Sequence, residues 1–508
     1  MARKEDLLRK AKKLIPELKK TRVWPTRTVV PEKDKDGFRA AEAKKYSETN
    51  LSTGEGVVLD FGRHVTGYLT VRFCSSGSHQ DAPAWIRVRF AERLSEFFED
   101  AEAYRGWVSK AWIQETQAHL DILPCKVSFP RRYAFRYVKI EVLDCSRKYQ
   151  VVVEEAYADA VSSADEGSLS AYPCRDPEME QLDRIAVSTL HECMQKVFED
   201  GPKRDRRLWM GDLRLEALAS YETYHADDLV KEGLYLFAGD TDADGRVSSN
   251  MFLEPEIEAD DASMFDYSLF FTTALRDYYA ETGDEEALND LYETAMRQLE
   301  LAEEQVGEDG TVRDSDEMGW CFVDWNLNLN KQASAHGIYL YALLAGAELS
   351  AWKGETERER SLREKHEAGV KAAVRSFWDE EKGVFVSGKE RQISLASQCW
   401  LILGRAVSAE QGAAALKTAE TLPQTEGMVT PYMYHHYIQA LLDCGCEKKA
   451  KEVLKAYWGG MAEDGADTFF ELYRPGHPNE SPYGGTIVNS YCHAWSCAPA
   501  YFIRKYGW

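Results

Sequence analysis

From about residue 51 the chain alternates apolar and polar positions in short runs separated by turn residues. The run 85–90, for example, reads Trp-Ile-Arg-Val-Arg-Phe, which puts its apolar side chains on one face of a strand. Similar runs recur at residues 56–62, 67–73, 134–142 and 149–155. Short strands separated by turns are typical of an all-β sandwich, which we expect over residues 51–165.

From about residue 175 onward, the apolar positions instead repeat at helical spacing. The clearest helices are predicted at residues 182–197, 214–236, 265–282, 286–307, 333–352, 361–377, 430–443 and 447–457. Roughly a dozen helices in hairpins, with no strand signal strong enough for βαβ units, predict an (α/α)6 barrel over residues 166–508. The expected fold class is therefore multidomain β + α, with an N-terminal β-sandwich followed by a helical barrel.

Residues 1–50 are expected to form a helix and a connection rather than a domain. Apolar positions repeat at helical spacing from Leu7 to Ile15, and Pro16 should end or kink that helix. Acidic residues such as Glu5 interrupt its basic character. This favours a helix docked on the protein over a helix lying on a membrane surface.

Composition narrows the class of protein further. The 508 residues are 44% apolar and 29% charged, as in globular proteins, and the chain is too long for one ordinary core. A net charge of −23 argues against nucleic acid or an anionic membrane as a partner. We recognise no secretory signal and no run long enough to span a bilayer. The 11 cysteines form no pair of Cys-x-x-Cys motifs, so we expect reduced thiols in a cytoplasmic protein without a metal site.

Candidate chemistry gathers in residues 200–212, which read Asp-Gly-Pro-Lys-Arg-Asp-Arg-Arg-Leu-Trp-Met-Gly-Asp. The Gly-Pro pair predicts a loop that leads into a helix. If that helix already includes Asp205, then Asp205, Trp209 and Asp212 share one face. Carboxylates beside a flat ring suit a sugar site, because the ring stacks on a pyranose while the carboxylates bind hydroxyls or transfer protons. The alternative is a charged, solvated helix start with the tryptophan in the core.

This stretch resembles the signature of bacterial α-L-rhamnosidases, glycoside hydrolase family 78, which reads Asp-Cys-Pro-x-Arg-Glu-x-x-x-Trp-Thr-Gly-Asp. The residues in register are Asp200, Pro202, Arg204, Trp209, Gly211 and Asp212. The family's general acid is a Glu, and Asp205 occupies its place here. Many members of the family carry a further C-terminal β-domain. This chain ends at Trp508, so it resembles a short form of the family that lacks that domain.

Two later segments extend the resemblance. Residues 465–471, Gly-Ala-Asp-Thr-Phe-Phe-Glu, resemble the family segment Gly-Ala-Thr-Thr-x-Trp-Glu, whose Glu is the general base, which implies that role for Glu471. Residues 489–495 resemble the family's closing Ser-x-x-His segment, which implies that His493 binds sugar hydroxyls. Without the resemblance, Glu471 would be read as a surface residue and His493 as a core residue.

Residues 320–325 resemble the Gly-Asp-Trp segment that lines the family's pocket, with Val323 in place of the Gly. The resemblance implies that Asp324 and Trp325 bind substrate, whereas Trp320 can be a core residue. The signature implies four further binding residues, which are Asp200, Arg204, Trp209 and Asp212.

Other features predict structure rather than chemistry. The Leu-Asp-Phe-Gly run at 59–62 resembles the β-domain that precedes the family's catalytic domain. A β-sandwich can itself bind carbohydrate, but we expect a structural role there because no row of exposed Trp and Tyr is evident. Residues 240–245 resemble the start of an EF-hand, but the twelfth position is Met251, so we expect a turn instead of a calcium site. The acidic stretch 254–266 is expected to be a solvated loop.

The resemblance implies an exo-acting glycoside hydrolase that removes terminal α-L-rhamnose with inversion and needs no cofactor. Asp205 would protonate the glycosidic oxygen, and Glu471 would activate a water molecule on the opposite face of the sugar. Two alternatives stay open. One is a hydrolase of the same fold for a different terminal sugar, since Asp replaces Glu at the acid position. The other is a catalytically weak carbohydrate-binding protein.

Overall fold

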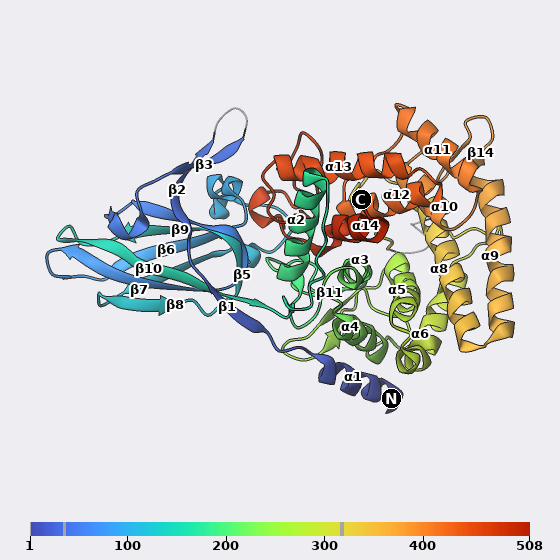
Figure 1. Ribbon diagram of the computed structural model, residues 1–508, viewed down its shortest axis with the longest axis horizontal. Helices are drawn as coiled ribbons and strands as arrows, with labels where there is room; N and C mark the ends of the chain where they lie inside the picture. Colours follow the sequence, from blue (N-terminus) through green and yellow to red (C-terminus); the bar gives the residue numbers. More distant parts are fainter. Residues whose placement is uncertain (1, 34–36, 315–319) are drawn as a thin grey trace.

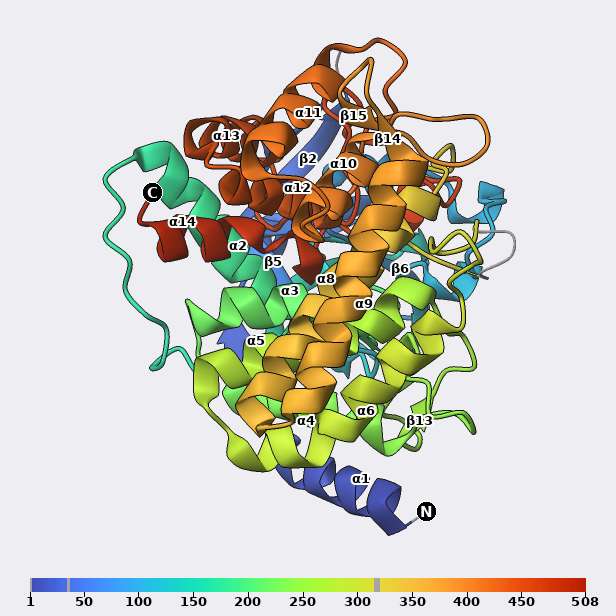
Figure 2. The same ribbon diagram turned by 90° about the vertical axis from the view of Figure 1, so that its right-hand side faces the viewer.

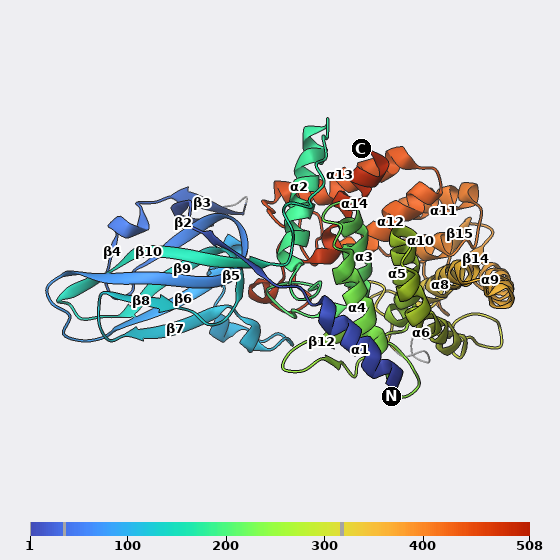
Figure 3. The ribbon, with the colours of Figure 1, turned by 60° about the horizontal axis from the view of Figure 1, so that its bottom comes forward.

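The computed structural model describes residues 2–33, 37–314 and 320–508, and it divides into a strand-rich part and a helical part (Figure 1). The strands gather at one end of the molecule and most helices at the other. The first helix, α1 (Ala2–Leu14), lies with the helical part (Figure 1, Figure 3). The chain therefore starts on the helical part, crosses to build the sheet, and returns at α2 (Pro177–Cys193).

Helix α1 docks on α4 (Asp227–Gly239) through the apolar stripe that the sequence indicates. Leu7 and Ala11 are buried. On its polar side, Lys10 Nζ donates a hydrogen bond to Glu286 Oε1 at 2.8 Å. The predicted docking helix is present, and it ends before Pro16 as expected.

Within the described ranges, ten strands join through antiparallel pairing into one sheet. They are β1 (Lys19–Val23), β2 (Arg27–Lys33), β3 (Phe38–Glu42), β4 (Asn50–Leu51), β5 (Gly56–Gly77), β6 (Ala84–Ala91), β7 (Glu115–Leu120), β8 (Cys125–Ser128), β9 (Tyr133–Asp144) and β10 (Tyr149–Ser162). The 22-residue β5 organises them, because its first part pairs with β2 and its second part with β8 and β10. Its register with β9 shifts between Asp60 and Val65, which lets one strand serve both regions.

The first three strands, and the first residue of β4, occupy residues that the sequence pattern assigns to a connection. In β1, Lys19 pairs opposite Ser162 of β10, and β2 pairs along β5. The structure therefore moves the start of the strand-rich part from residue 51 to Lys19. The pattern misses β1 because it lies at the end of the sheet's strand order, and its sequence, Lys-Lys-Thr-Arg-Val, is mostly exposed. Lysines are typical of such edge strands, where they block pairing with other chains.

The helical part begins with α2 and continues through eleven further described helices. In addition to α4 they are α3 (Met210–Tyr221), α5 (Phe265–Thr282), α6 (Glu285–Glu303), α8 (Gln332–Lys353), α9 (Thr356–Phe377), α10 (Leu395–Leu403), α11 (Ala409–Thr421), α12 (Pro431–Asp443), α13 (Glu447–Glu463) and α14 (Ala498–Tyr506). Short strands lie between them: β11 (Leu208–Trp209), β12 (Asn250–Phe252), β13 (Glu258–Ala259), β14 (Trp378–Asp379) and β15 (Val384–Phe385). Single 3-10 turns are η1 (Tyr46–Glu48), η2 (Leu94–Phe98), η3 (Ala101–Ala103), η4 (Lys110–Trp112), η5 (Thr486–Val488) and η6 (Ala494–Ser496).

Consecutive helices pack as hairpins, and one helix of each hairpin packs on the next. Helix α3 packs on α5, α5 on α8, α8 on α10 and α10 on α12, while α14 packs on both α2 and α3. Every residue of α3 is buried, as expected for a helix surrounded by others. Helix α9 lies alongside α8 and buries only one face (Figure 2).

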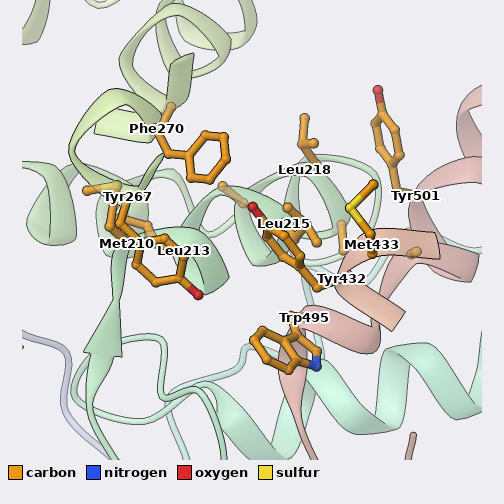
Figure 4. Packing of buried hydrophobic residues seen from close by; sticks show 14 of the residues in the cluster. Met210, Leu213, Leu215, Leu218, Tyr267, Phe270, Tyr432, Met433, Trp495 and Tyr501 are labelled. Atoms are coloured by element: carbon orange, nitrogen blue, oxygen red, sulfur yellow. The ribbon is translucent and has the colours of Figure 1, made fainter. Parts of the chain in front are cut away.

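The core beneath the inner helices is rich in aromatic residues (Figure 4). Phe270 of α5 lies 6.3 Å from Tyr432 of α12, measured between ring centroids. Tyr432 in turn lies 5.7 Å from Trp495. Segments that are far apart in the sequence therefore meet through these rings, which fixes the floor of the region described below.

One predicted helix, 214–236, is two helices in the structure. The chain breaks after α3, where His225 adopts a left-handed backbone with a φ of 52°. The N–H of His225 donates to the carbonyl of Ser220 at 2.8 Å, and the N–H of Ala226 donates to its hydroxyl at 3.1 Å. The polar groups of Ser220 thus terminate one helix and start the turn into the next.

All eleven cysteines lie among the described residues, and each has a free thiol. None of the helices in the described ranges is long and apolar enough to cross a membrane.

Candidate active site

A cavity of about 350 Å³ opens where the strand-rich part meets the helical part. This volume falls in the range of small-molecule sites, roughly 300–1,000 Å³. Its walls come from a rim segment after β6, the loop before α3, the start of α5, the loop before α8 and the segment between α13 and α14. The predicted site residues that line it are Asp200, Arg204, Asp205, Trp209, Asp212, Trp325, Glu471 and His493.

Asp200 and Arg207 close the loop that leads into α3. The N–H of Asp200 donates to the carbonyl of Arg207, and the N–H of Arg207 donates to Oδ1 of Asp200, both at 3.0 Å. Glycine is needed at position 201 because a Cβ there would lie 2.8 Å from Ser490 Oγ. The loop is therefore closed at its base by these hydrogen bonds. At Gly201 it packs against Ser490, which lies far later in the sequence.

Asp205 lies in this loop and not in a helix. The conditional expectation that it shares a helical face with Trp209 and Asp212 is wrong, because α3 begins only at Met210. The left-handed backbone of Arg206, with a φ of 63°, turns the chain directly after Asp205. Through this turn, and not through helical spacing, all three predicted side chains line the cavity.

Glu471 is the more deeply buried of the two candidate catalytic carboxylates. Its Oε1 accepts a hydrogen bond from the hydroxyl of Tyr483, and its Oε2 accepts one from Nη2 of Arg204. Burial raises the pKa of Glu471, and the nearby Asp205 raises it further, against the lowering effect of Arg204 and Tyr483. The net pKa of Glu471 lies above that of an ordinary glutamate.

One guanidinium group connects the two carboxylates. Arg204 Nη1 lies 3.9 Å from Asp205 Oδ1, while Nη2 is bonded to Glu471. Its Nε donates to the carbonyl of Val488 at 2.7 Å, and its centre lies 3.9 Å from the ring centroid of Tyr483. Asp205 differs from Glu471 in exposure, since 29% of its side chain is accessible compared with 7% for Glu471.

Asp212 and His493 form a polar pair with unused hydrogen-bonding capacity. Asp212 Oδ1 and His493 Nδ1 lie 3.5 Å apart, and neither has a hydrogen-bond partner among the described residues. Burial lowers the pKa of His493 and so does Arg204, which keeps the imidazole neutral. Burial and then the charge of Glu471 raise the pKa of Asp212. Buried polar atoms without partners that line a cavity can bind the hydroxyl groups of a ligand.

Asp200 has a similar electrostatic setting. Burial raises its pKa well above the ordinary value, as do the carboxylates of Asp205 and Asp212. The indole of Trp209 is half-buried and meets the ring of Tyr267 edge-on, with centroids 6.2 Å apart. A ring fixed in this way presents a constant apolar face to the cavity.

Asp324 is the one predicted site residue that does not line the cavity. Its carboxylate accepts hydrogen bonds from the N–H groups of Val429 and Thr430 at 2.9 and 3.0 Å, and from the hydroxyl of Thr430. It therefore fixes the start of α12. Its neighbour Trp325 does line the cavity, and the buried Nε1 of that indole has no partner in the described part of the chain.

Asp266 was grouped with an acidic loop in the sequence, but it is buried and structural. Its Oδ2 accepts hydrogen bonds from the N–H groups of Phe322 and Val323 at 3.0 and 2.9 Å. Val323 has a φ of 55°, a conformation that favours glycine and strains a β-branched residue. Asp266 thus holds in place the strained turn that presents Phe322 and Trp325 to the cavity.

Several residues that line the cavity, mainly aromatic ones, were not predicted from the sequence. The rim segment contributes Trp107 and Trp112, and the later segments contribute Tyr483 and Trp495. The strand-rich part, for which we expect a structural role, therefore also supplies part of the cavity wall. Trp107 and Trp112, which lie in the loop after β6, could have indicated this contribution from the sequence, because tryptophan side chains are mostly buried in contacts. Trp320 lies at the cavity and is 50% exposed, so it is not a core residue.

Residues 240–245, which resemble the start of an EF-hand, form a turn, as predicted. Asp242 Oδ1 accepts hydrogen bonds from the N–H groups of Asp244 and Arg246 at 2.9 and 2.8 Å, which uses its carboxylate internally. Within the described ranges, no cluster of three or more His, Cys, Asp or Glu side chains has the arrangement of a metal site.

Two carboxylates, one buried and one more exposed, thus meet in one recessed cavity, and a pair of carboxylates is what hydrolysis of a glycosidic bond uses. Residues 28–160 match the glycosyl hydrolase family 78 alpha-rhamnosidase N-terminal domain, and residues 168–506 match the bacterial alpha-L-rhamnosidase 6 hairpin glycosidase domain. The chain belongs to glycoside hydrolase family 78, the α-L-rhamnosidases.

Solved structures agree with this assignment. A rhamnosidase from Klebsiella oxytoca, solved with rhamnose bound, is 44% identical, with a TM-score of 0.96 and 99% of each chain covered. The family 78 rhamnosidase of Bacillus sp. GL1 shares the fold at 20% identity and a TM-score of 0.77, over 92% of this chain and 49% of that one. The Streptomyces avermitilis α-L-rhamnosidase shares it at 15% identity and a TM-score of 0.66, over 96% of this chain and 44% of that one. No curated protein sequence matches the chain.

Proposed function

We propose that the protein is an exo-acting α-L-rhamnosidase that releases terminal L-rhamnose with inversion of configuration. The observation that carries the proposal is the pairing of a buried Glu471 with a more exposed Asp205 in one cavity, spanned by Arg204. The relative from Klebsiella oxytoca, which covers 99% of this chain, was solved with rhamnose, and this supports the same sugar here. The same likeness and the order of helix contacts support an (α/α)6 barrel for the helical part.

Asp205 acts as the general acid in this mechanism and Glu471 as the general base. Asp205 donates its proton to the glycosidic oxygen as the bond to the leaving group breaks. Glu471 removes a proton from a water molecule that attacks the anomeric carbon from the opposite face. Inverting hydrolases hold such carboxyls roughly 6.5–9.5 Å apart to admit the water molecule.

The hydrogen bonds around Glu471 suit a base. Burial opposes ionisation of its carboxyl, but the guanidinium of Arg204 and the hydroxyl of Tyr483 both stabilise the anion. The same contacts fix the orientation of the carboxylate, so that its position does not change when water or substrate enters.

The remaining predicted residues bind the sugar. Trp209 and Trp325 supply apolar faces for the C–H side of the ring. Asp200, Asp212 and His493 supply hydroxyl partners, of which Asp212 Oδ1 and His493 Nδ1 are unpaired in the described structure. Asp324 has no such role in this proposal, because its carboxylate is used to cap α12.

The test is a panel of nitrophenyl glycosides with α-L-rhamnoside first, assayed with the wild type and with Glu471→Gln. We expect nitrophenol release from the rhamnoside and a loss of about 10²–10⁴-fold in kcat in the variant, the usual contribution of a general base. Release from a different glycoside would move the substrate to another terminal sugar. Binding of rhamnose without release from any glycoside would instead identify a carbohydrate-binding protein.

A further inference from the structure

His64 lies outside the candidate active site but is linked to it through buried charges. It is part of β5, where the register with β9 shifts between Asp60 and Val65. Such a bulge changes the direction in which side chains point, and the imidazole is buried here. It lines a separate cavity of about 240 Å³, which shares no lining residue with the candidate active site in the described part of the chain.

The two ring nitrogens of His64 face carboxylates from different elements. Nε2 lies 2.9 Å from Oε1 of Glu92, which directly follows β6, and Nδ1 lies 3.6 Å from Oε2 of Glu192 on α2. Burial lowers the pKa of His64, but the neighbouring Cys492, Glu192 and Glu92 raise it by more, so that the net pKa lies well above the ordinary value. The imidazole is therefore protonated on both nitrogens, and Nε2 donates to Glu92.

Glu92 contacts two segments that carry candidate active-site residues. Its Oε2 accepts a hydrogen bond at 2.8 Å from the N–H of Tyr491, which shortly precedes His493 in the sequence. The same oxygen lies 3.7 Å from Nζ of Lys203, which shortly precedes Asp205 in the sequence. One carboxylate of the strand-rich part therefore contacts both segments.

The position of Lys203 depends on two carboxylates. Its Nζ donates to Oε2 of Glu96 at 2.6 Å, a closer contact than the 3.7 Å to Glu92. Among the described residues, the other cation within 4 Å of Glu92 is His64. Without His64 the buried charge of Glu92 would have Lys203 as its remaining cation, and attraction to Glu92 would draw the ammonium group away from Glu96. The backbone next to Asp205 would move with it.

We propose that His64 is a positioning residue of the reaction. By binding Glu92 it keeps Lys203 at Glu96, and so fixes the loop that presents Asp205 to the glycosidic oxygen. The inference rests on the proposed function, since it takes Asp205 as the general acid. Asp205 lies in a loop before α3, where helical hydrogen bonds do not hold it, so contacts of its neighbours decide where its carboxyl lies.

The experiment compares two neutral variants that reach different carboxylates. The amide nitrogen of a glutamine takes the place of Nε2, whereas that of an asparagine takes the place of Nδ1. His64→Gln therefore keeps a donor for Glu92, and His64→Asn does not. We expect kcat/KM for methyl α-L-rhamnoside to fall about ten- to a hundredfold in His64→Asn, the effect of one lost hydrogen bond to a charged group, and less than about tenfold in His64→Gln.

The leaving group separates positioning from a general loss of structure. Because 2,4-dinitrophenolate leaves with little help from an acid, 2,4-dinitrophenyl α-L-rhamnoside should lose far less than the methyl rhamnoside in His64→Asn. His79→Asn, which changes an exposed histidine just after β5, is the control and should behave as the wild type. Equal losses on both substrates, or equal losses in His64→Asn and His64→Gln, would overturn the proposal.

A double variant tests whether the charge of Glu92 carries the effect. Glu92→Gln keeps an acceptor for the N–H of Tyr491 but removes the charge that would draw Lys203 away. His64→Asn combined with Glu92→Gln should therefore regain most of the activity on the methyl rhamnoside. If His64→Asn does not fold, the same comparison is made with His64→Gln. A double variant no better than the single one, or a failure of every variant at position 64 to fold, would overturn the proposal.

A measurement without substrate separates this inference from the proposed function. If the wild type hydrolyses no rhamnoside, the proposed function fails, and amide hydrogen exchange of the folded proteins then decides whether His64 fixes the loop. The N–H groups of Asp200 and Arg207, which close the loop, should exchange about tenfold faster in His64→Asn than in the wild type. In the double variant they should return to the wild-type rate. Equal rates in all three proteins would overturn the role of His64.

Discussion

At the scale of single residues, the acid position is where this chain departs from its family's signature. Asp205 is one methylene shorter than the glutamate found there, and it lies within the loop that Asp200 and Arg207 close. The left-handed turn at Arg206 sets the direction of the chain directly after it. Because the aspartate side chain is shorter, the loop backbone must place its carboxyl closer to the substrate. The geometry of the loop is therefore part of the proposed function of Asp205.

If Asp205 is the acid, its removal should matter most when the leaving group needs a proton. We expect Asp205→Asn to lower kcat/KM about 10²–10⁴-fold for an alkyl or sugar leaving group, and far less for a 2,4-dinitrophenyl leaving group. The measurement is a plot of kcat/KM against the pKa of the leaving group. Asp261→Asn, which changes an exposed carboxylate in the loop before α5, is the control and should follow the wild-type line. A uniform loss for all leaving groups would assign Asp205 to binding instead.

The proposed role of Glu471 as base implies a pH dependence of activity whose sign follows from the contacts of its carboxylate. Glu471 must be ionised to act, and its pKa lies above the ordinary glutamate value because it is buried. Activity should therefore fall on the acid side at a higher pH than an ordinary glutamate would give. Tyr483→Phe removes a hydrogen bond that stabilises the anion, so the acid limb of kcat/KM should move to still higher pH. A limb that stays in place, or moves to lower pH, would contradict this role for Glu471.

At the scale of elements, the loop before α3 is attached to the strand-rich part by a buried charge. The side chain of Lys203 is 1% exposed, and its Nζ donates to Glu96 Oε2 at 2.6 Å and lies 3.7 Å from Glu92 Oε2. Removing the cation would leave two carboxylates buried without it. We expect Lys203→Met to lower the free energy of unfolding by about 3–5 kcal/mol, measured by chemical denaturation.

The control for that prediction is an exposed pair of the same type. Lys365 Nζ lies 2.6 Å from Glu303 Oε2, with 37% and 45% of the two side chains accessible. Lys365→Met should change the free energy of unfolding by less than about 1 kcal/mol, because solvent screens an exposed pair. If the two variants were equally stable, the buried contact would not hold the loop.

The elements also indicate how far the sequence determines the structure. Helix α5 coincides with the prediction at both ends, because buried positions run through it from Phe265 and Gly283 follows it with a left-handed backbone. Strands β1 to β4 were missed, since β1 is exposed and polar and is specified by its pairing with β10. The family signature led to Asp205 and Glu471, but not to Tyr483 or Trp107. Those residues reach the cavity through contacts between distant segments, which periodicity does not encode.

At the scale of the whole molecule, the strand-rich part builds the cavity together with the helical part. Glu99 accepts hydrogen bonds from the N–H groups of Thr486 and Ile487 at 3.0 and 3.1 Å, and from the hydroxyl of Thr486. These bonds hold the turn that follows Tyr483, which itself bonds Glu471. The position of Glu471 thus depends on a carboxylate from the other part of the molecule.

We therefore expect Glu99→Ala to act through Tyr483. It should lower kcat/KM about tenfold, in proportion to the loss of charged hydrogen bonds, and shift the acid limb in the same direction as Tyr483→Phe. Glu102→Ala, three positions along and with 93% of its side chain exposed, is the matched control. If Glu99→Ala lowered the stability of the protein but did not shift the acid limb of the kcat/KM profile, Glu99 would only support the contact between the strand-rich and helical parts.

The docking of α1 on α4 has a consequence for synthesis of the chain. At ~5–20 residues per second, the apolar stripe around Leu7 leaves the ribosome roughly 10–50 s before α4 is complete at Gly239. During that interval the strands can pair, but the stripe has no partner. Completion of α4 then fixes the start of the chain onto the helical part after the sheet has formed between them. During synthesis, docking of α1 should consequently come after the strands can pair and before the helices that follow Gly239 have been made.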